Sequence, residues 1–340
     1  MGPDIEGHSR QPMHGRSAWL ITDGKAGTEA ICLGLADRLG LDYKVLRVAP
    51  EGLARALAPW GPVPRGEAFG TPASRFQPPW PAVAIASGRT SIPYLRALSR
   101  LAGHQTFRIV LQDPHTPAGI ADVIWVPEHD QRRGTNVIHT PTPPHRFSPA
   151  RIAELRKTPP EWLAALPSPR VAMLIGGPSG RWRYDEGTID RLKADIASVA
   201  AKAGSLLVTT SRRTPTELVS AIDLATREKP RHLFRGQGEN PYPHYLAFAD
   251  AFFVTGDSVN MVGEAAVTGR PIHLFMPAGG GAKFVRFHAA IAAAGATRPF
   301  DPAVAELPEW AYPPLYSTEK IAEEIEARWA RRQDMLPSGR

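Results

Sequence analysis

The stretch DAFFVTGDSVNMVGEAAVTGRPIHLF, residues 250–275, decides the fold. A short, mostly apolar run is followed by a polar turn that contains glycine, then by a segment long enough for a helix, and then by a second apolar run. This order of strand, loop, helix and strand is typical of a parallel sheet covered by helices. Ligands bind such sheets at the carboxyl ends of the strands, so loop 256–260 is the first place to seek a site.

The same unit recurs on both sides of this stretch. In the second half of the chain, we predict further strands at 170–175, 205–210 and 231–235, and helices at about 188–203, 215–227 and 258–268. In the first half, we predict strands at 17–22, 43–48, 82–86, 107–111, 122–126 and 136–140, and helices from Thr28 to Gly40 and from Pro93 to Gly103. The pattern therefore predicts an α/β protein with two Rossmann-like domains, whose parallel sheets are covered by helices.

The segments between these elements give the expected domain limits. We expect one domain at 17–160 and a second at 168–290, with a proline-rich linker in the stretch that separates the two patterns. Residues 1–16 are polar and predict a disordered lead-in. Residues 291–340 form a tail that is first rich in proline and then helical, and such a tail can pack back on the first domain.

The amino-acid composition indicates which classes of partner the protein can bind. Lys and Arg number 40 against 33 Asp and Glu, so the net charge is +7 and favours an anionic partner. We expect no nucleic acid, because no basic helix, zinc finger or RNA-binding aromatic signature accompanies this charge. Cys32 is the only cysteine, and no Cys pair or His-Glu-x-x-His string predicts a metal site. We therefore expect no metal, no other cofactor and a cytoplasmic location, with peripheral contact at the inner membrane face left open.

The loops after the first, third and fourth predicted strands carry groups suited to chemistry. The residues after the first and third strands are Asp23, Gly24, Lys25, Gly27, Ser87, Gly88 and Arg89. Backbone N–H groups at the start of a helix would suit an anion, although a tight turn alone would also explain the two glycines of the first loop. Asp113 and His115 follow the fourth strand, as a general base or as groups that cap a turn.

The loops of the second half are richer in polar groups. The candidates are Gly176, Gly177, Ser211, Arg212, Asp257, Ser258, Asn260, Met261, Glu264 and Lys283. Guanidinium groups after a strand suit phosphate, because their geometry matches its oxygens; a solvated capping loop is the alternative. Ser258 and Asn260 can cap a helix whose N–H groups face a ligand, and Glu264, about two turns further on, can accept hydrogen bonds from sugar hydroxyls.

Five strings carry a family resemblance: LITDGKAG, LIGGPSGRWRY, TTSRRTP, GDSVNMVGEAAVTGRP and GGGAKFVRFH. Over about residues 17–290 the chain resembles the family of the plant mitochondrial-fission factor and its bacterial relatives, which are commonly described as candidate glycosyltransferases. That resemblance implies a GT-B fold, in which two Rossmann-like domains face each other across a cleft. It also implies that the C-terminal domain binds a nucleotide-sugar donor and that the N-terminal domain binds a glycan or lipid-linked acceptor.

The resemblance assigns roles to the candidate residues. It implies that Asp257, Ser258, Asn260 and Met261 lie at the donor diphosphate, Glu264 lies near the ribose, and Ser211 and Arg212 hold phosphate. No Asp-x-Asp motif is present, which agrees with a metal-independent glycosyltransferase. If the source is bacterial, we expect this enzyme to act in envelope or surface glycan assembly. Asp23 and Asp113 are the candidates for the base that removes the acceptor proton.

Two features keep other functions open. The plant relatives' role in recruiting fission machinery implies an alternative, a protein that keeps the fold and works as a binding scaffold without catalysis. The segment 58–81, rich in proline, tryptophan and arginine, is either an ordered surface excursion or a loop that meets a membrane interface.

Overall fold

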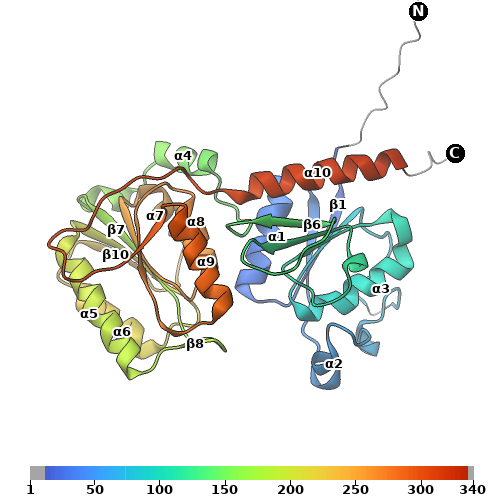
Figure 1. The fold of residues 1–340 in the computed structure, drawn as a ribbon, viewed down its shortest axis with the longest axis horizontal. Coiled ribbons are helices and arrows are strands. Elements are labelled where there is room, and N and C mark those ends of the chain that lie inside the picture. The colour runs from blue at the N-terminus through green and yellow to red at the C-terminus, as the bar shows by residue number, and fades with distance from the viewer. Residues whose placement is uncertain (1–11, 73, 336–340) are drawn as a thin grey trace, which may run out of the picture. The chain divides into compact units, whose positions relative to one another are not determined.

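The computed structural model describes residues 12–72 and 74–335 of the chain, which form two compact units. Unit 1 takes its described residues from Met1–Thr140, Pro144–Arg146 and Ser317–Arg340. Unit 2 consists of Pro141–Pro143 and Phe147–Tyr316. Each unit contains a parallel six-stranded sheet flanked by helices, so the predicted α/β class with two Rossmann-like sheets is confirmed (Figure 1).

The sheet of unit 1 has the strand order β2-β1-β3-β4-β5-β6, and all of its pairs are parallel. Its strands are β1 (Ser17–Thr22), β2 (Asp42–Arg47), β3 (Val83–Ser87), β4 (Phe107–Leu111), β5 (Val123–Pro127) and β6 (Val137–Thr140). The four inner strands β1, β3, β4 and β5 are buried over most of their length, as continuous apolar runs predict.

The helices of unit 1 are α1 (Ala26–Arg38), α2 (Gly52–Leu57), α3 (Ile92–Ala102) and α10 (Ser317–Met335). α10 lies alongside α1 and β6, although it is almost at the other end of the sequence from α1 (Figure 1). Its Ile321 and Ile325 are fully buried in the core beneath α1, and Glu319 forms an ion pair with Arg38. The C-terminal helix is therefore part of the first sheet's hydrophobic core.

The described end of the expected lead-in differs from the prediction of disorder. Met13 is 3% exposed and belongs to the same core as α10, and the N–H of Gly15 donates a 2.7 Å hydrogen bond to the carbonyl of Gly40. Met13 has no apolar neighbour at a helix or strand spacing, so the sequence pattern does not predict its burial. Residues 1–11, the rest of the expected lead-in, lie outside the described residues.

The sheet of unit 2 has the strand order β10-β9-β7-β11-β12-β14, again wholly parallel. Its strands are β7 (Arg170–Ile175), β9 (Ser205–Thr210), β10 (Arg231–Phe234), β11 (Ala251–Thr255), β12 (Ile272–Phe275) and β14 (Thr297–Pro299). A separate antiparallel ribbon pairs β8 (Trp182–Arg183) with β13 (Ala278–Gly279). The first part of the tail thus adds the edge strand β14 to this sheet.

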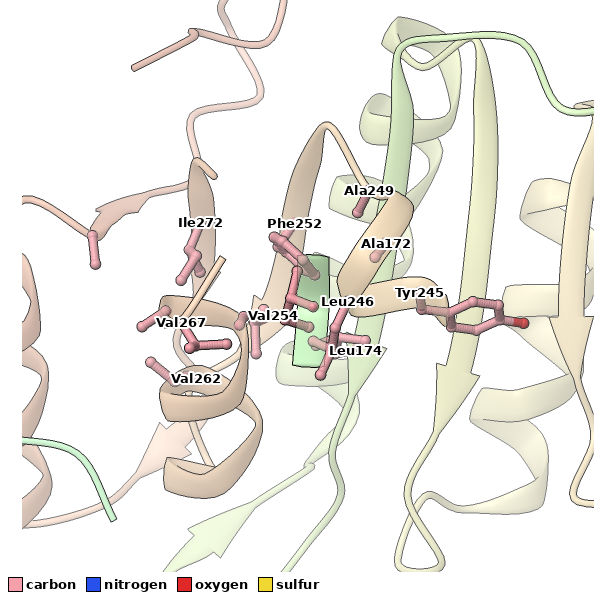
Figure 2. Close-up of a cluster of buried hydrophobic side chains, with 14 of the residues drawn as sticks. Ala172, Leu174, Tyr245, Leu246, Ala249, Phe252, Val254, Val262, Val267 and Ile272 are labelled. Carbon is pink, nitrogen blue, oxygen red and sulfur yellow. The ribbon is translucent and has the colours of Figure 1, made fainter. Parts of the chain in front are cut away.

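The helices of unit 2 are α4 (Pro149–Lys157), α5 (Glu186–Lys202), α6 (Thr216–Thr226), α7 (Tyr242–Phe248), α8 (Val259–Ala266) and α9 (Ala282–Ala293). Figure 2 shows how α8 is held: Val262 and Val267 point towards Val254 and Ile272 of the sheet. This packing fixes the start of α8 at the carboxyl end of β11. No helix among the described residues is both long and apolar enough to cross a membrane.

Candidate functional site

Four loops of unit 2 gather at the carboxyl edge of its sheet. They follow β7, β9, β11 and β12, which are neighbours in the sheet and run in the same direction. This edge is where parallel sheets bind their ligands, because the loops and helix N-termini converge there. The candidates predicted in the second half of the chain lie in these loops or in the first two turns of the helices α8 and α9 that follow them.

Asp257 joins three of these segments. Its side chain is fully buried and accepts hydrogen bonds from the N–H of Gly177 at 3.0 Å, the hydroxyl of Tyr184 at 2.7 Å and the guanidinium of Arg213 at 2.9 Å. Burial and the nearby Asp257 charge raise the pKa of Tyr184, which therefore stays a donor. From the sequence, we expected Asp257 at the donor diphosphate. Its carboxylate instead accepts hydrogen bonds from the protein itself and so links these loops to one another.

Gly176 and Gly177 make this approach possible. A Cβ atom on Gly176 would lie 2.2 Å from Oδ2 of Asp257, and one on Gly177 would lie 2.4 Å from the carbonyl oxygen of Arg213. These two positions, predicted to bind the donor, therefore require glycine for the packing of the loops, whether or not a ligand binds there.

The arginine that faces inward is Arg213, not its neighbour Arg212. Both arginines are exposed, but Arg213 donates to the carbonyl of Gly177 at 2.6 Å and to the carboxylate of Asp257 at 2.9 Å. Ser211 accepts from the backbone N–H of Arg213 at 3.2 Å, so its hydroxyl helps to shape the same turn. From the sequence, we predicted Arg212 of the two as the site residue, because adjacent arginines in a loop give no sign of which one turns inward.

The first turn of α8 is the accessible part of that helix. Ser258 caps it by accepting a 3.4 Å hydrogen bond from the N–H of Met261. Ser258, Asn260 and Met261 are partly exposed, whereas residues 262–267 are buried. The N-terminal turn, where a helix attracts anions, is therefore the part of α8 that meets solvent.

Glu264 lies further along the same helix and is 9% exposed. Its Oε2 accepts a 2.6 Å hydrogen bond from the hydroxyl of Tyr242 on α7. Burial raises the pKa of Glu264 to about 7, against the opposing effect of that hydrogen bond. The pKa of Tyr242 is raised too, first by burial and then by the Glu264 charge. The site thus contains a carboxyl group that changes its charge near neutral pH.

The start of α9 adds positive charge to the same edge. β13 and the glycines after it lie against the β8 ribbon strand, where the N–H of Gly280 donates to the carbonyl of Arg181 at 2.7 Å. Lys283 and Arg286 are exposed on the first two turns of α9.

Unit 1 has a cavity of about 250 Å³ at the carboxyl edge of its own sheet. Asp23, Lys25, Gly88, Arg89, Asp113 and His115 are among its lining residues. Three of the predicted residues are placed elsewhere: Ser87 is buried and donates to the carbonyl of Leu111, and Gly24 and Gly27 are absent from the cavity lining.

Asp23 is held as an anion by its neighbours. Its side chain is 6% exposed, pairs with Lys25 and accepts from the hydroxyl of Thr28. Burial alone would raise the pKa of Asp23, but the hydrogen bonds from Lys25 and Thr28 outweigh it, so the pKa is lowered. A carboxylate stabilised in this way is a weak proton acceptor.

Asp113 is also paired. It accepts from Arg132 at 2.7 Å and from the backbone N–H of His115 at 2.9 Å. Nδ1 of His115 lies 3.6 Å from Oδ2 of Asp113, and the His115 side chain is 75% exposed. Asp113 is therefore engaged by Arg132, and the exposed imidazole of His115 is the other group of this cavity with the chemistry of a general base.

The part of the chain that the structure describes contains no cluster of side chains suited to bind a metal ion. Nowhere in it do three or more His, Cys, Asp or Glu side chains come together as ligands for a metal ion.

Comparison with known proteins places this architecture in a family. The family model described as "Mitochondrial fission ELM1" matches residues 26–329. The chain belongs to this family. It is 30% identical over 278 residues to the mitochondrial fission protein ELM1 of Arabidopsis thaliana, an alignment that covers 74% of this chain and 65% of the plant protein. It is 27% identical over 161 residues to the uncharacterized protein RP120 of Rickettsia prowazekii (strain Madrid E), covering 46% and 45%.

The chain therefore spans less than two thirds of the length of either of these two relatives. Among solved structures, it is similar to MurG of Acinetobacter baumannii, with 12% identity, a TM-score of 0.48 and coverage of 95% and 96%. It is also similar to UGT89C1 of Arabidopsis thaliana, solved in complex with UDP, with 12% identity, a TM-score of 0.49 and coverage of 96% of both chains.

Proposed function

We propose that this ELM1-family protein binds a nucleotide-sugar donor at the carboxyl edge of the unit 2 sheet and transfers the sugar to a glycan or lipid-linked acceptor. The observation that carries the proposal is the pairing, on one helix, of an accessible N-terminal turn with the buried carboxyl group of Glu264. Ser258 and Glu264 are six residues apart, about 9 Å along a helix axis. That separation is comparable with the reach from a diphosphate to the hydroxyls of its ribose.

The proposed donor site has charges that suit a diphosphate. The positive ends of α8 and α9 and the exposed side chains of Lys283 and Arg286 supply positive potential. Asp257 does not oppose it, because Arg213 neutralises that carboxylate. In the proposed reaction these groups stabilise the negative charge of the leaving diphosphate, which a metal-independent transfer requires.

The transfer needs a proton acceptor, and the cavity of unit 1 supports His115 in this role. The acceptor oxygen forms a bond to the anomeric carbon while the bond from that carbon to the phosphate oxygen breaks. The nucleoside diphosphate leaves, and the acceptor proton passes to the imidazole of His115. Asp113 positions the ring, whereas Asp113 and Asp23 are themselves held in ion pairs.

The test is calorimetric titration with a panel of nucleoside diphosphates and their sugar conjugates, with and without EDTA. The proposal expects one nucleotide to bind saturably, binding that EDTA leaves unchanged, and weaker binding by Glu264→Gln. A folded protein that binds none of the panel would overturn the proposal.

A non-catalytic binding protein is the second candidate. It is favoured by the engagement of both predicted carboxylate bases in ion pairs. It expects a nucleotide sugar to bind without hydrolysis or transfer, and it expects His115→Gln to leave cellular function intact. Loss of cellular function in a folded His115→Gln protein that still binds the donor would favour the enzyme.

A further inference from the structure

Exposed apolar side chains gather on one projection of unit 1. Leu53 is 80% exposed, Leu57 is 54% exposed and Trp60 is 60% exposed. These three side chains lie within eight residues of the chain, on α2 and the turn after it, and no residue of α2 is buried. Large apolar side chains that cluster on a surface mark an interaction site more often than single ones do.

The geometry places the apolar groups together. Leu53 and Leu57 are four residues apart in α2, so they share one face of the helix. The N–H of Trp60 donates a 2.9 Å hydrogen bond to the carbonyl of Leu57, so the chain turns immediately after the helix. Figure 1 shows α2 projecting from unit 1, away from the sheet.

Two arginines from the body of unit 1 hold this projection in place. Arg89 donates to the carbonyl of Arg55 at 3.0 Å, and Arg96 donates to the carbonyls of Pro59 at 3.2 Å and Trp60 at 2.6 Å. A surface that is already ordered loses little conformational entropy on binding. The apolar side chains of α2 are therefore presented on a fixed support.

Two exposed arginines lie near the apolar side chains in the sequence: Arg55 is on α2 itself, and Arg65 follows Trp60 by five residues. Arg55 and Arg65 are exposed, and within the described residues neither has an acidic partner; Arg75, by contrast, pairs with Glu67. Leu, Trp and Arg in this arrangement match a lipid interface, where aromatic and aliphatic groups enter the boundary of the acyl chains and arginines meet the headgroup phosphates. A stable protein–protein interface buries about 800 Å² of surface on each partner, which is far more than three side chains on a short helix supply.

We propose that Leu53, Leu57 and Trp60, with Arg55 and Arg65, form a docking surface for an anionic lipid membrane; these residues are called the α2 patch. The two leucines and the tryptophan enter the interface, and the two arginines contact lipid phosphates. This docking does not rest on sugar transfer, because the α2 patch includes none of the residues assigned to donor or acceptor chemistry.

The test is flotation of the full chain with vesicles of phosphatidylcholine alone and of phosphatidylcholine mixed with phosphatidylglycerol. Wild type is expected to bind the anionic vesicles and to be released by salt, which screens the arginines. Leu57→Gln combined with Trp60→Ser is expected to lower the partition coefficient by about tenfold or more, since each buried apolar side chain favours the interface. Removal of either arginine is expected to lower it by about fivefold.

Leu101→Gln is the matched control, because Leu101 lies on α3 of the same unit and is 54% exposed, as Leu57 is. It is expected to bind as wild type does. Thermal melts of every variant exclude unfolding as a cause, since each substitution is at an exposed position. The proposal is overturned if wild type stays with neither vesicle, or if the α2 variants and Leu101→Gln bind equally. It is also overturned if the α2 variants only dissociate a dimer seen by light scattering.

Discussion

Tyr242 and Glu264 join α7 to α8 through a 2.6 Å hydrogen bond from the tyrosine hydroxyl to the glutamate carboxyl group. The ring of Phe147 packs against Tyr242, with ring centroids 5.7 Å apart. The carboxyl group is thereby enclosed on a helix whose first turn remains accessible. Its pKa of about 7 makes the stability of the folded protein depend on pH near neutrality.

Glu264→Gln is expected to remove one pH dependence of stability. The pKa of Glu264 is about 7 in the folded protein and 4.5 for a glutamate in the unfolded chain. The folded state therefore holds this proton more tightly. The resulting stability is fully present below about pH 4.5 and is lost as the pH rises through about 7, to a total of roughly 3 kcal/mol. Urea unfolding at several pH values would show wild type losing stability over this range relative to Glu264→Gln.

Tyr242→Phe is the control for this titration. It removes the hydrogen bond that lowers the pKa of Glu264, so the loss of stability is expected to move to higher pH. Parallel pH profiles for wild type and Glu264→Gln would contradict the assignment.

Asp257→Ala and Arg213→Ala are expected to lower the free energy of unfolding by different amounts, although the two side chains form one ion pair. Asp257 is fully buried, and its loss leaves Tyr184 and the N–H of Gly177 without their acceptor, at a cost of about 3 kcal/mol. Arg213 is 42% exposed, so solvent replaces part of its role, and the cost is expected to be about 1 kcal/mol. Equal free energies of unfolding for the two variants would show that Asp257 is not the centre of this network.

Gly88→Ala is expected to destabilise unit 1 by about 2 kcal/mol or more. Gly88 has a φ of +90°, and an added Cβ would lie 2.6 Å from Cγ of Asp23. Gly66→Ala is the matched control, because a Cβ there meets nothing within 4 Å. Similar melting temperatures for the two variants would contradict the close approach of Asp23 to Gly88.

Buried strands were the most predictable part of the fold. Runs such as 107–111 and 170–175 coincide with β4 and β7, because a central strand of a parallel sheet is apolar on both faces. β14, with three residues, and the two-residue strands β8 and β13 are too short for any periodicity to reveal them. Their positions depend on tertiary pairing.

The candidate site was predictable by residue type but not by partner. Glu264 was identified from its spacing after Ser258, whereas Tyr242 lies 22 residues earlier, in a short helix with no polar motif. Only the packing of α7 against α8 brings the two together. The orientation of Arg213 in place of Arg212 also depends on the local backbone, which the sequence pattern does not specify.

His115→Gln is expected to abolish sugar transfer and leave donor affinity unchanged, because His115 lies in unit 1 and the proposed donor site lies in unit 2. Asp113→Asn is expected to lower turnover less, since it only positions the ring. Calorimetry and a turnover assay on the same preparations separate the two effects. Full turnover by His115→Gln would remove it from the mechanism.

The most direct test of the account is titration of the nucleotide sugar identified by the panel into wild type and Glu264→Gln at about pH 6 and about pH 8. Ribose hydroxyls donate to the ionised carboxylate, so wild-type affinity is expected to rise about tenfold between these pH values as Glu264 loses its proton. The affinity of Glu264→Gln is expected to be low and independent of pH. Tight binding by both proteins with the same pH profile would contradict the placement of the donor ribose at Glu264.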